Sequence, residues 1–480
     1  MTILPLNPTE NASLESLAAF FGHCRAAARA DGRAKLASIT VAVDALDPLA
    51  VLESIYEPAE LHFFAEHPKL ETALAGAEAV LAFEASGPGR FAAVQAWVDE
   101  TLRHTVAVGS LEAPFGGPHF FTSFTFLDAV EPGEVFPSAR VFVPRWQVAR
   151  AGDLTTAVAN VVVAPDVDLA ALTERVWRAH RTFSEFTYKR VSTVASAPDT
   201  SGGTISAKEI GNYPVAVADA LRRIERGDFQ KIVLARAKDL SLQHALHPLR
   251  VLNDLRQRFP ACYSFSIGDG RGRSFIGASP ERLVRVSRGR LETEALAGSA
   301  RRGASASEDA ALAHALLRSE KDLREQRLVL ESIARRLAPL GVEVDLNVRP
   351  GLRRLANVQH LSTPIQAVLP SGVRLLDALA VLHPTPAVGG SPREAVLDQI
   401  RELEGFPRGL YAGALGWLNA RDGGEFFVGI RSALIDGSHA RVYAGAGIVA
   451  GSTPEQEFAE TELKFDALLA GLRRGRVDAD

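Results

Sequence analysis

The sequence predicts an α+β protein in which large antiparallel or mixed β-sheets form a layered sandwich core and helices pack outside. Two observations predict this class. Short apolar runs rich in β-branched residues alternate irregularly with helical stretches, without the regular strand–helix repeat of a doubly wound sheet. Near the C-terminus three strand-like runs, 410–418, 425–435 and 440–444, follow one another with no helix between them. No internal repeat period is present.

The first part of the chain combines strands and helices but carries no catalytic constellation. Residues 37–43, 139–143 and 157–163 are strand-like, and residues 90–102 have helical spacing. The Ala-rich stretch 70–83 predicts a helix that runs into a strand.

A polar segment, 195–204, has the composition of a linker and suggests a division of the chain. We therefore predict an N-terminal α/β region, 1–205, that contributes to the shared sandwich, and a catalytic region, 206–475. The same segment is equally compatible with a long surface loop within one fold. In the catalytic region the patterns predict helices at 213–226, 306–338 and 454–472, strands at 231–235 and 282–286, and a hairpin of 261–267 with 274–276.

Composition sets the general class. The 480 residues are 47% hydrophobic and 23% charged, with a formal net charge of −4, which is typical of a soluble globular protein and offers no basic face for nucleic acid. The two cysteines, Cys24 and Cys262, match no metal-ligand or disulfide pattern. With no signal peptide and no run long enough to span a membrane, we expect a cytoplasmic protein without nucleic-acid or membrane partners.

Two acidic pairs repeat the same helical spacing. Asp322 and Glu325 are three residues apart, as are Glu457 and Glu460, and residues at this spacing share a helix face. Two such helices facing each other would gather four carboxylates, whose hard oxygens suit Mg²⁺. Each pair alone is also compatible with a solvated face whose acids pair with Lys321, Arg324 or Lys464.

The second pair follows a strand with small residues, 443–449. Thr453 is suited to the N-cap of the next helix and Pro454 to its first position. Exposed amides in such a segment can hold a carboxylate. An ordinary tight connection between a strand and a helix is the alternative.

Several ordered motifs of the second half resemble the chorismate-utilising enzymes, which include anthranilate, aminodeoxychorismate, isochorismate and salicylate synthases. The resemblance covers about 206–472, and the N-terminal half matches weakly. The matching segments are 229–236 (FQKIVLAR), 279–283 (SPERL), 295–302 (ALAGSARR), 319–322 (SEKD), 358–361 (VQHL), 383–387 (HPTPA), 409–413 (GLYAG), 429–431 (GIR) and 444–449 (AGAGIV).

The resemblance implies a fold like that of anthranilate synthase component I and a Mg²⁺ cofactor. By position, Glu325 and Glu460 would ligate the metal, while Asp322 and Glu457 would support it through water. The physical logic agrees, because a dicarboxylate substrate cannot approach four carboxylates without a cation between them.

The resemblance also implies the contacts to chorismate. Tyr411 and Arg431 match side chains that hold the enolpyruvyl carboxylate, and Arg431 suits a bidentate clamp. A surface ion pair is the alternative for Arg431, disfavoured by its expected place within an apolar strand. A satisfied core histidine is the alternative for His360, which matches a position beside the ring. The remaining implied substrate-binding residues are the backbone of Gly445, Ala446 and Gly447, and Lys464, Gly298, Ser299 and Ala387.

Lys231 and Glu281 are the implied catalytic pair. In isochorismate-forming relatives, an uncharged lysine activates a water that attacks C2 of the ring, and a buried, protonated glutamate gives its proton to the departing C4 hydroxyl. An ordinary charge at the head of a strand is the alternative for Lys231.

The same positions separate the subfamilies. Anthranilate synthases carry glutamine at position 231, and aminodeoxychorismate synthases often carry lysine at position 297, where this chain has Ala297. Salicylate synthases commonly have threonine at positions 299 and 387, where this chain has Ser299 and Ala387. We therefore predict an isomerase, an isochorismate synthase, with salicylate synthase and a non-catalytic chorismate-binding protein as alternatives.

The product of an isochorismate synthase feeds menaquinone, siderophore or salicylate biosynthesis. The long N-terminal half favours the menaquinone type by analogy only. We expect a monomer.

Overall fold

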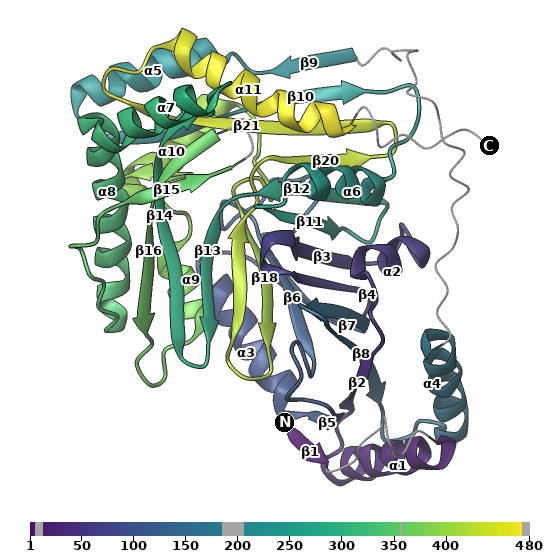
Figure 1. The fold of residues 1–480 in the computed structure, drawn as a ribbon. Coiled ribbons are helices and arrows are strands. Elements are labelled where there is room, and N and C mark those ends of the chain that lie inside the picture. Colours follow the sequence, from purple (N-terminus) through teal and green to yellow (C-terminus); the bar gives the residue numbers. More distant parts are fainter. Residues whose placement is uncertain (5–12, 185–205, 356–357, 473–480) are drawn as a thin grey trace.

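The strands of the protein form one hydrogen-bonded network that divides into two wings at β7 (Ala139–Ala151). The computed structural model describes residues 1–4, 13–184, 206–355 and 358–472 (Figure 1). β7 pairs along one edge with β4 (Thr72–Ala85), and along the other with β6 (His119–Phe124) and β8 (Leu154–Val163). We call the branch that begins at β4 the first wing and the branch that begins at β6 the second wing.

The first wing carries the strand with Lys231, β10. In order of pairing from β4, its strands are β3 (His62–His67), β11 (Tyr263–Gly268), β12 (Arg273–Ser279), β20 (Ser432–Asp436), β21 (His439–Val449) and β10 (Lys231–Ser241), with β9 (Ser206–Ile210) and β17 (Gly390–Ser391) on the far edge of β10. All of these pairings are antiparallel.

The second wing is also antiparallel. From β6 its strands are β18 (Ala414–Asn419), β19 (Gly424–Val428), β13 (Arg282–Ser287), β14 (Arg290–Arg301), β16 (Val358–Val368) and β15 (Gly351–Arg354). Along the same edge of β7 that pairs with β6, the network also continues through β8 to β2 (Lys35–Val43), β5 (Thr105–Gly109) and β1 (Thr2–Leu4). In this branch β5 pairs in parallel with both of its neighbours.

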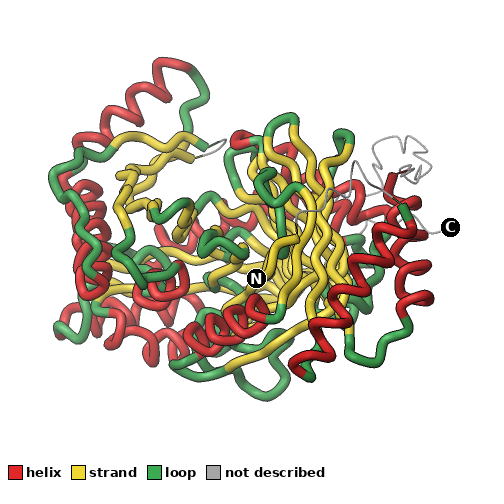
Figure 2. Tube along the Cα trace, turned by 90° about the horizontal axis from the view of Figure 1, so that it is seen from below, coloured by secondary structure: helices red, strands yellow, loops and turns green. Residues whose placement is uncertain are grey.

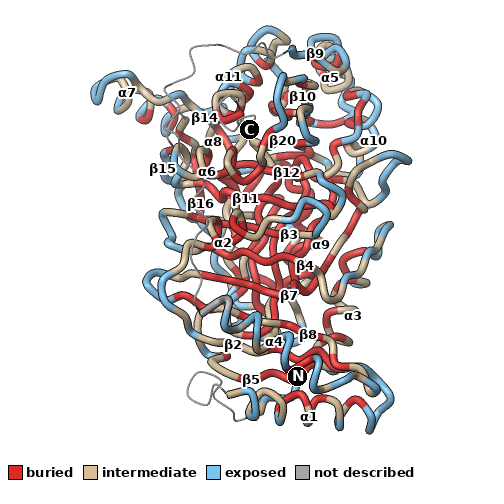
Figure 3. The backbone as a smooth tube through the Cα atoms, turned by 90° about the vertical axis from the view of Figure 1, so that its right-hand side faces the viewer, coloured by how far each residue is buried: buried red, intermediate tan, exposed pale blue. Residues whose placement is uncertain are grey.

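The two wings pack face to face through aromatic side chains. Phe63 of the first wing stacks on Phe121 of the second, with ring centroids 4.6 Å apart. Tyr263 and Phe265 of the first wing contact Phe427 of the second at 5.0 and 5.2 Å. Buried residues concentrate in these strands (Figure 3). Burial of large aromatic surfaces between the sheets is the main stabilising term of such a sandwich.

Helices lie along the outside of the strands (Figure 2). They are α1 (Leu14–Asp31), α2 (Pro48–Ser54), α3 (Arg90–Arg103), α4 (Leu169–Ser184), α5 (Tyr213–Arg226), α6 (Pro248–Arg258), α7 (Ala306–Arg318), α8 (Glu320–Leu337), α9 (Leu375–Leu382), α10 (Arg393–Glu404) and α11 (Pro454–Leu472), with short 3₁₀ turns at Pro68–Leu70 and Ala338–Leu340. The predicted α+β class, with antiparallel and mixed sheets and outer helices, is confirmed.

Strands from the two predicted regions pair with each other. β3 of the N-terminal region lies beside β11, and β6 lies beside β18. The proposed linker, 195–204, lies outside the described residues. The catalytic half of the chain is therefore built on strands supplied by both regions.

Three sequence predictions of secondary structure are wrong. The stretch 70–83 is no helix but lies mostly in β4, because its small side chains are packed between β3 and β7 and tertiary context overrides alanine's helix propensity. The helical region 306–338 is broken at Ser319, which ends α7 and caps α8. The strand 425–435 is two strands, β19 and β20, separated by Gly429–Arg431, and residues 410–413 precede β18.

Within the described residues, no helix combines the length and the apolar character needed to cross a membrane.

Candidate active site

Lys231 occupies the first position of β10, where three strands meet. It faces Val449 of β21 on one side and Ser391 of β17 on the other. Its side chain is buried and extends over Gly447, where a Cβ atom would lie 3.1 Å from Lys231 Cε. The lysine Nζ donates a hydrogen bond to Glu325 Oε1 at 2.6 Å. The absence of a side chain at Gly447 thus leaves room for the amine to reach α8.

Glu325 and Asp322 lie in the first turns of α8. The Ser319 side chain accepts a hydrogen bond from the Asp322 N–H and begins the helix. Burial would raise the pKa of Glu325, but the charge and hydrogen bond of Lys231 bring the pKa below its ordinary value, with Lys321 and Lys464 contributing. Because Lys464 belongs to α11, the start of α8 and the acidic face of α11 lie close together.

Asp322 packs against Gly298 of β14. Gly298 has φ +73°, and a Cβ atom there would lie 3.0 Å from Asp322 Cβ. The strand β14 also changes register against β16 at this point, between Ala297 and Ser299. Glycine is therefore required both for the backbone conformation and for the approach of α8.

The second acidic pair lies in α11. Thr453 accepts a hydrogen bond from the Gln456 N–H at 3.3 Å, so the predicted N-cap is confirmed. Burial raises the pKa of Glu457, with the charge of Glu460 adding to the effect of burial. Glu460 accepts a hydrogen bond from Lys464 Nζ at 2.8 Å, and the same Nζ donates to the Gly445 carbonyl at 2.6 Å.

The four acids do not form a ready-made ligand cluster. Among the described residues, no group of three or more His, Cys, Asp or Glu side chains is arranged as a metal site. Glu325 is paired with Lys231 and Glu460 with Lys464, so each of these carboxylates has an ammonium group as its partner. The oxygen donors nevertheless fit a hard divalent cation, which would compete with the lysines for the same carboxylates.

Glu281 is buried directly before β13 and directly after Ser279-Pro280. Its carbonyl accepts the Val428 N–H at 3.0 Å, which ties it to β19. Burial, reinforced by the charge of Glu294, raises the pKa of the carboxyl from 4.5 to about 7, against the opposing charges of Arg353 and Lys231. A carboxyl of this kind holds its proton near neutral pH, as a general acid must.

The predicted carboxylate-binding segment lies at an open edge of β21. Val233 and Ala235 of β10 direct their N–H groups away from β21, to the Gly389 carbonyl and to Glu404. Facing residues of an antiparallel pair exchange both hydrogen bonds or neither. Gly447 and Gly445, which face them, therefore also direct their N–H groups away from β10, to the side that β20 covers only as far as Val442.

Ala446 differs from its two neighbours. It faces Leu234, so its N–H is directed toward β10 and is used by the strand pairing. Of the three predicted backbone contacts, Gly445 and Gly447 present amides to the open edge, and Ala446 does not.

Tyr411 and Arg431 both lie outside the strands in which the sequence placed them. The Tyr411 hydroxyl lies 2.7 Å from where a Cβ of Gly445 would be, and its ring stacks on Tyr443. Arg431 is not in the middle of a strand, as predicted, but has φ +51° in the break between β19 and β20. Burial lowers the pKa of the Arg431 guanidinium, which lies beside Cys262.

His360 and Ser299 form a hydrogen bond across β14 and β16, with Ser299 Oγ 2.8 Å from His360 Nδ1. Burial, together with the charges of Arg431, Lys464 and Arg353, lowers the pKa of His360 to about 3, so the ring is neutral. Its Nε2 atom is buried without a hydrogen-bond partner among the described residues. This unpaired atom favours a ligand-facing role over that of a satisfied core histidine.

Ala387 lies, partly buried, in the loop between α9 and β17, one residue before Val388 and two before Gly389. Gly389 accepts the Val233 N–H at 2.9 Å, so this loop is fixed to β10 close to Lys231.

Sequence reasoning missed Arg353. It lies on β15 opposite His360, forms an ion pair with Glu294, and its charge acts on both Glu281 and His360. The adjacent arginines Arg353 and Arg354, shortly before the strand that carries His360, are the signal that was available. The site therefore combines carboxylates from two helices with a surrounding set of cations: Lys231, Arg353, Arg431 and Lys464.

Comparison with known proteins identifies the family. A family model described as chorismate binding enzyme matches residues 22–473. The chain belongs to the chorismate-binding enzyme family.

Members of this family that are similar to the chain include isochorismate synthases. The salicylate biosynthesis isochorismate synthase of Pseudomonas aeruginosa is 35% identical, covering 96% of this chain and 94% of the relative. The isochorismate synthase MenF of Bacillus subtilis is 31% identical, covering 94% and 96%. The predicted family is thus confirmed.

Solved structures agree with this assignment. The menaquinone-specific isochorismate synthase MenF from Escherichia coli superposes with a TM-score of 0.74 at 26% identity, covering 91% of this chain and 94% of that chain. Anthranilate synthase component I from Streptococcus pneumoniae shares the fold, with a TM-score of 0.66 at 22% identity and coverage of 83% and 92%.

Glu281→Gln should change the pH dependence of stability. Below pH 4.5 the carboxyl is protonated in both folded and unfolded chains and has no effect. As the pH rises toward 7, the carboxyl loses its proton in the unfolded chain before it does in the folded protein. The wild type therefore loses up to about 3 kcal/mol of stability, whereas the glutamine variant has no titrating group here and loses none. In urea denaturation, the free energy of unfolding of the variant minus that of the wild type should be larger at pH 8 than at pH 5. An equal difference at both pH values would contradict the raised pKa.

Gly298→Ala should destabilise the protein more than Gly289→Ala. Both glycines have positive φ, +73° and +72°, so both substitutions have a backbone penalty of about 1 kcal/mol. Only at Gly298 would the new methyl group meet Asp322, whereas nothing lies within 4 Å at Gly289. We expect an additional loss of about 1–3 kcal/mol in denaturation experiments for Gly298→Ala alone. Equal losses would show that α8 does not pack on this residue.

Proposed function

We propose that the protein is an isochorismate synthase, an isomerase that converts chorismate reversibly to isochorismate. The reaction adds water at C2 of the ring, shifts the ring double bonds and releases the C4 hydroxyl as water, so the composition of the substrate is unchanged. The observation that carries the proposal is the convergence of Lys231 and Glu281, whose charges interact, beside the carboxylates of α8. Similarity to isochorismate synthases over nearly the whole chain supports it.

Lys231 and Glu281 suit the two proton transfers. Lys231, buried at the head of β10, would take a proton from the attacking water when the amine is uncharged. Glu281, whose pKa is about 7, holds a proton near neutral pH and would give it to the leaving hydroxyl. The amine comes from the first residue of β10 and the carboxyl from the residue before β13, and we propose that the substrate ring lies between them.

The second carboxylate of chorismate would occupy the open edge of β21. The amides of Gly445 and Gly447 point to this side, and the hydroxyl of Tyr411 lies beside Gly445. Arg431 supplies positive charge to the same region, where it acts on His360 together with Lys464. Cations and backbone amides together are suited to a dianionic substrate.

Glu325 and Glu460 would hold Mg²⁺, with Asp322 and Glu457 behind them. When bound, the cation would neutralise the carboxylates and draw charge from the ring carboxylate. The oxygen donors and the closeness of the two helix starts support this assignment. Lys231 and Lys464 pair with these two glutamates, so the cation would compete with the two lysines for the carboxylates.

The proposal extends to the reaction and not to a single pathway. Relatives are named for menaquinone, for salicylate and for 2,3-dihydroxybenzoate. The expectations of a monomer, a cytoplasmic location and no nucleic-acid or membrane partner stay predictions.

Incubation of the purified protein with chorismate and Mg²⁺ should yield isochorismate, identified by chromatography and mass. Lys231→Ala should lower the turnover number at least 100-fold, because it removes the base. Chorismate should still bind to this variant, as measured by calorimetry, because the binding groups remain.

The control is Lys208→Ala, an exposed lysine on β9, which should turn over at the wild-type rate. Salicylate and pyruvate as the main products would instead assign a salicylate synthase. Binding of chorismate without any conversion would assign a non-catalytic protein.

Glu460→Gln should weaken metal binding. The substitution removes one of the proposed ligand charges, so the affinity for Mn²⁺, followed by electron paramagnetic resonance as a probe of the Mg²⁺ site, should fall at least tenfold. Glu455→Gln, an exposed residue in the first turn of the same helix, is the matched control and should leave the affinity unchanged. Equal Mn²⁺ affinity in both variants would exclude Glu460 as a ligand.

A further inference from the structure

The outer edge of β10 has a gap in its strand pairing. One edge of β10 is paired with β21 over the whole strand. On the other edge, β17 pairs with Lys231 and Ile232, and β9 pairs from Ala237 onward. No described strand pairs with residues 233–236 on this side. The gap begins two residues after Lys231, so whatever fills it fixes the position of the lysine.

Two side chains and one carbonyl fill this gap. The Ala235 N–H donates to Glu404 Oε1 at 2.6 Å, and the Val233 carbonyl accepts a hydrogen bond from an Arg408 terminal nitrogen at 2.8 Å. The Val233 N–H donates to the Gly389 carbonyl at 2.9 Å. Glu404 and Arg408 thus take the place of a neighbouring strand, with a carboxylate as acceptor and a guanidinium as donor.

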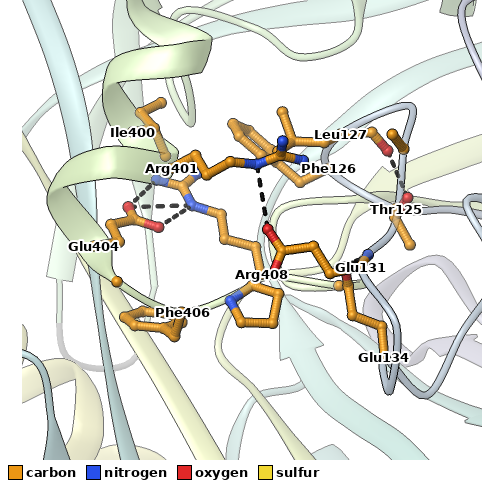
Figure 4. Close-up of a pocket in the computed structure, with 14 residues that line it drawn as sticks. Thr125, Phe126, Leu127, Glu131, Glu134, Ile400, Arg401, Glu404, Phe406 and Arg408 are labelled. Carbon is orange, nitrogen blue, oxygen red and sulfur yellow. Dashed lines mark hydrogen bonds and ion pairs between the residues drawn. The ribbon is translucent and has the colours of Figure 1, made fainter.

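The two side chains form a buried ion pair. Glu404 is the last residue of α10, and its side chain is 1% exposed, while that of Arg408 is 3% exposed. Arg408 Nε donates to Glu404 Oε2 at 2.9 Å, and the guanidinium lies over the ring of Phe126 at 4.1 Å (Figure 4). A buried pair of this kind gains little net stability over an apolar pair of the same size, because both charges lose their hydration. The hydrogen bonds that the pair makes to β10 therefore matter more than its contribution to folding stability.

Arg408 also holds the two other segments of the site. A second terminal nitrogen donates to the Val388 carbonyl at 2.9 Å, next to Ala387. The carbonyl of Arg408 accepts the Tyr411 N–H at 2.9 Å, and the guanidinium lies 5.8 Å from the Tyr411 ring. One arginine thus connects the strand of Lys231, the loop of Ala387 and the turn of Tyr411.

We propose that Glu404 and Arg408 are positioning residues that set the place of Lys231 and Tyr411 relative to the substrate. The inference rests on the proposed function, since it assigns these residues to the same reaction. The pair acts through the backbone of β10 and does not touch the reacting atoms. Misplacement of a catalytic group by about 1 Å can lower a rate 100-fold, so loss of the pair should affect turnover more than binding.

The test compares Arg408→Met, Arg408→Lys and Glu404→Gln with Glu402→Gln. Glu402 lies two residues earlier on α10 and pairs with Arg223 at 2.9 Å on the surface, so Glu402→Gln makes the same chemical change away from β10. Arg408→Met should lower kcat for chorismate about 10- to 100-fold, with KM within about twofold of the wild type. Arg408→Lys should recover part of this loss, because it keeps the charge but cannot reach two carbonyls at once. Glu402→Gln should match the wild type.

A fold defect is separated from a positioning defect by a second variant. Arg408→Met leaves the buried Glu404 without its partner, so the double variant Glu404→Gln/Arg408→Met removes both charges and should fold. Kcat within twofold of the wild type in the folded double variant would overturn the proposal. So would a fall in activity that only follows the fraction of unfolded protein.

Amide hydrogen exchange gives a readout that does not depend on activity. In the double variant, peptides that cover 232–236 should exchange faster than in the wild type, while Glu402→Gln should leave them unchanged. Unchanged exchange in this segment would show that the pair does not hold β10. If the wild type fails to form isochorismate, the proposed function fails, and the exchange result still tests whether the pair holds the strand.

Discussion

The antiparallel pairing of β10 with β21 is the constraint on which the site depends. It runs over eleven facing residues, from Lys231 opposite Val449 to Ser241 opposite His439. Because the strands are antiparallel, the first residue of β10 lies beside the last residue of β21, and α11 begins five residues later. The pairing therefore places a lysine from the middle of the chain beside the segment that leads into α11, the helix of Glu457 and Glu460. Helix α8 then needs only a short approach, over Gly298, to bring Glu325 to the same amine.

The charged groups of the site lie in pairs and affect one another's protonation. Glu325 and Glu460 are each held by a lysine, and Glu281 is raised in pKa by burial and by Glu294. Burial lowers the pKa of His360, and the charges of Arg431, Lys464 and Arg353 lower it further, so the ring is neutral. Such an arrangement is suited to a dianionic ligand together with a divalent cation. The cation would be attracted by the carboxylates, and the dianion by the arginine and lysine side chains. The electrostatics thus support the chemistry inferred from the motifs.

The elements that were predicted correctly are those whose ends are set by residues close in sequence. Helix α5 has the predicted bounds because Asn212 caps its start and Gly227, in the left-handed conformation, ends it. The stretch in β4 was predicted as a helix because alanine propensity is local, whereas its burial between β3 and β7 is not. Arg353 and the Glu404–Arg408 pair went unnoticed for the same reason. Their roles depend on backbone groups of distant segments, such as the Val233 carbonyl, which have no signature in the sequence.

On the edge of β10 opposite β21, side chains complete a strand pairing that is interrupted near the site. A continuous strand on this edge would pair with β10 but would displace Gly389, Glu404 and Arg408 from the backbone groups of Val233 and Ala235. Here β17 and β9 leave an interval, and side chains from the end of α10 and the following loop complete it. Because Arg408 is a single residue and not a strand, it bonds β10 and the loop of Ala387 through its side chain and the turn of Tyr411 through its carbonyl at the same time. β10 is thus held along one edge by its pairing with β21, and along the other edge, between β17 and β9, by an ion pair that also bonds the loop of Ala387.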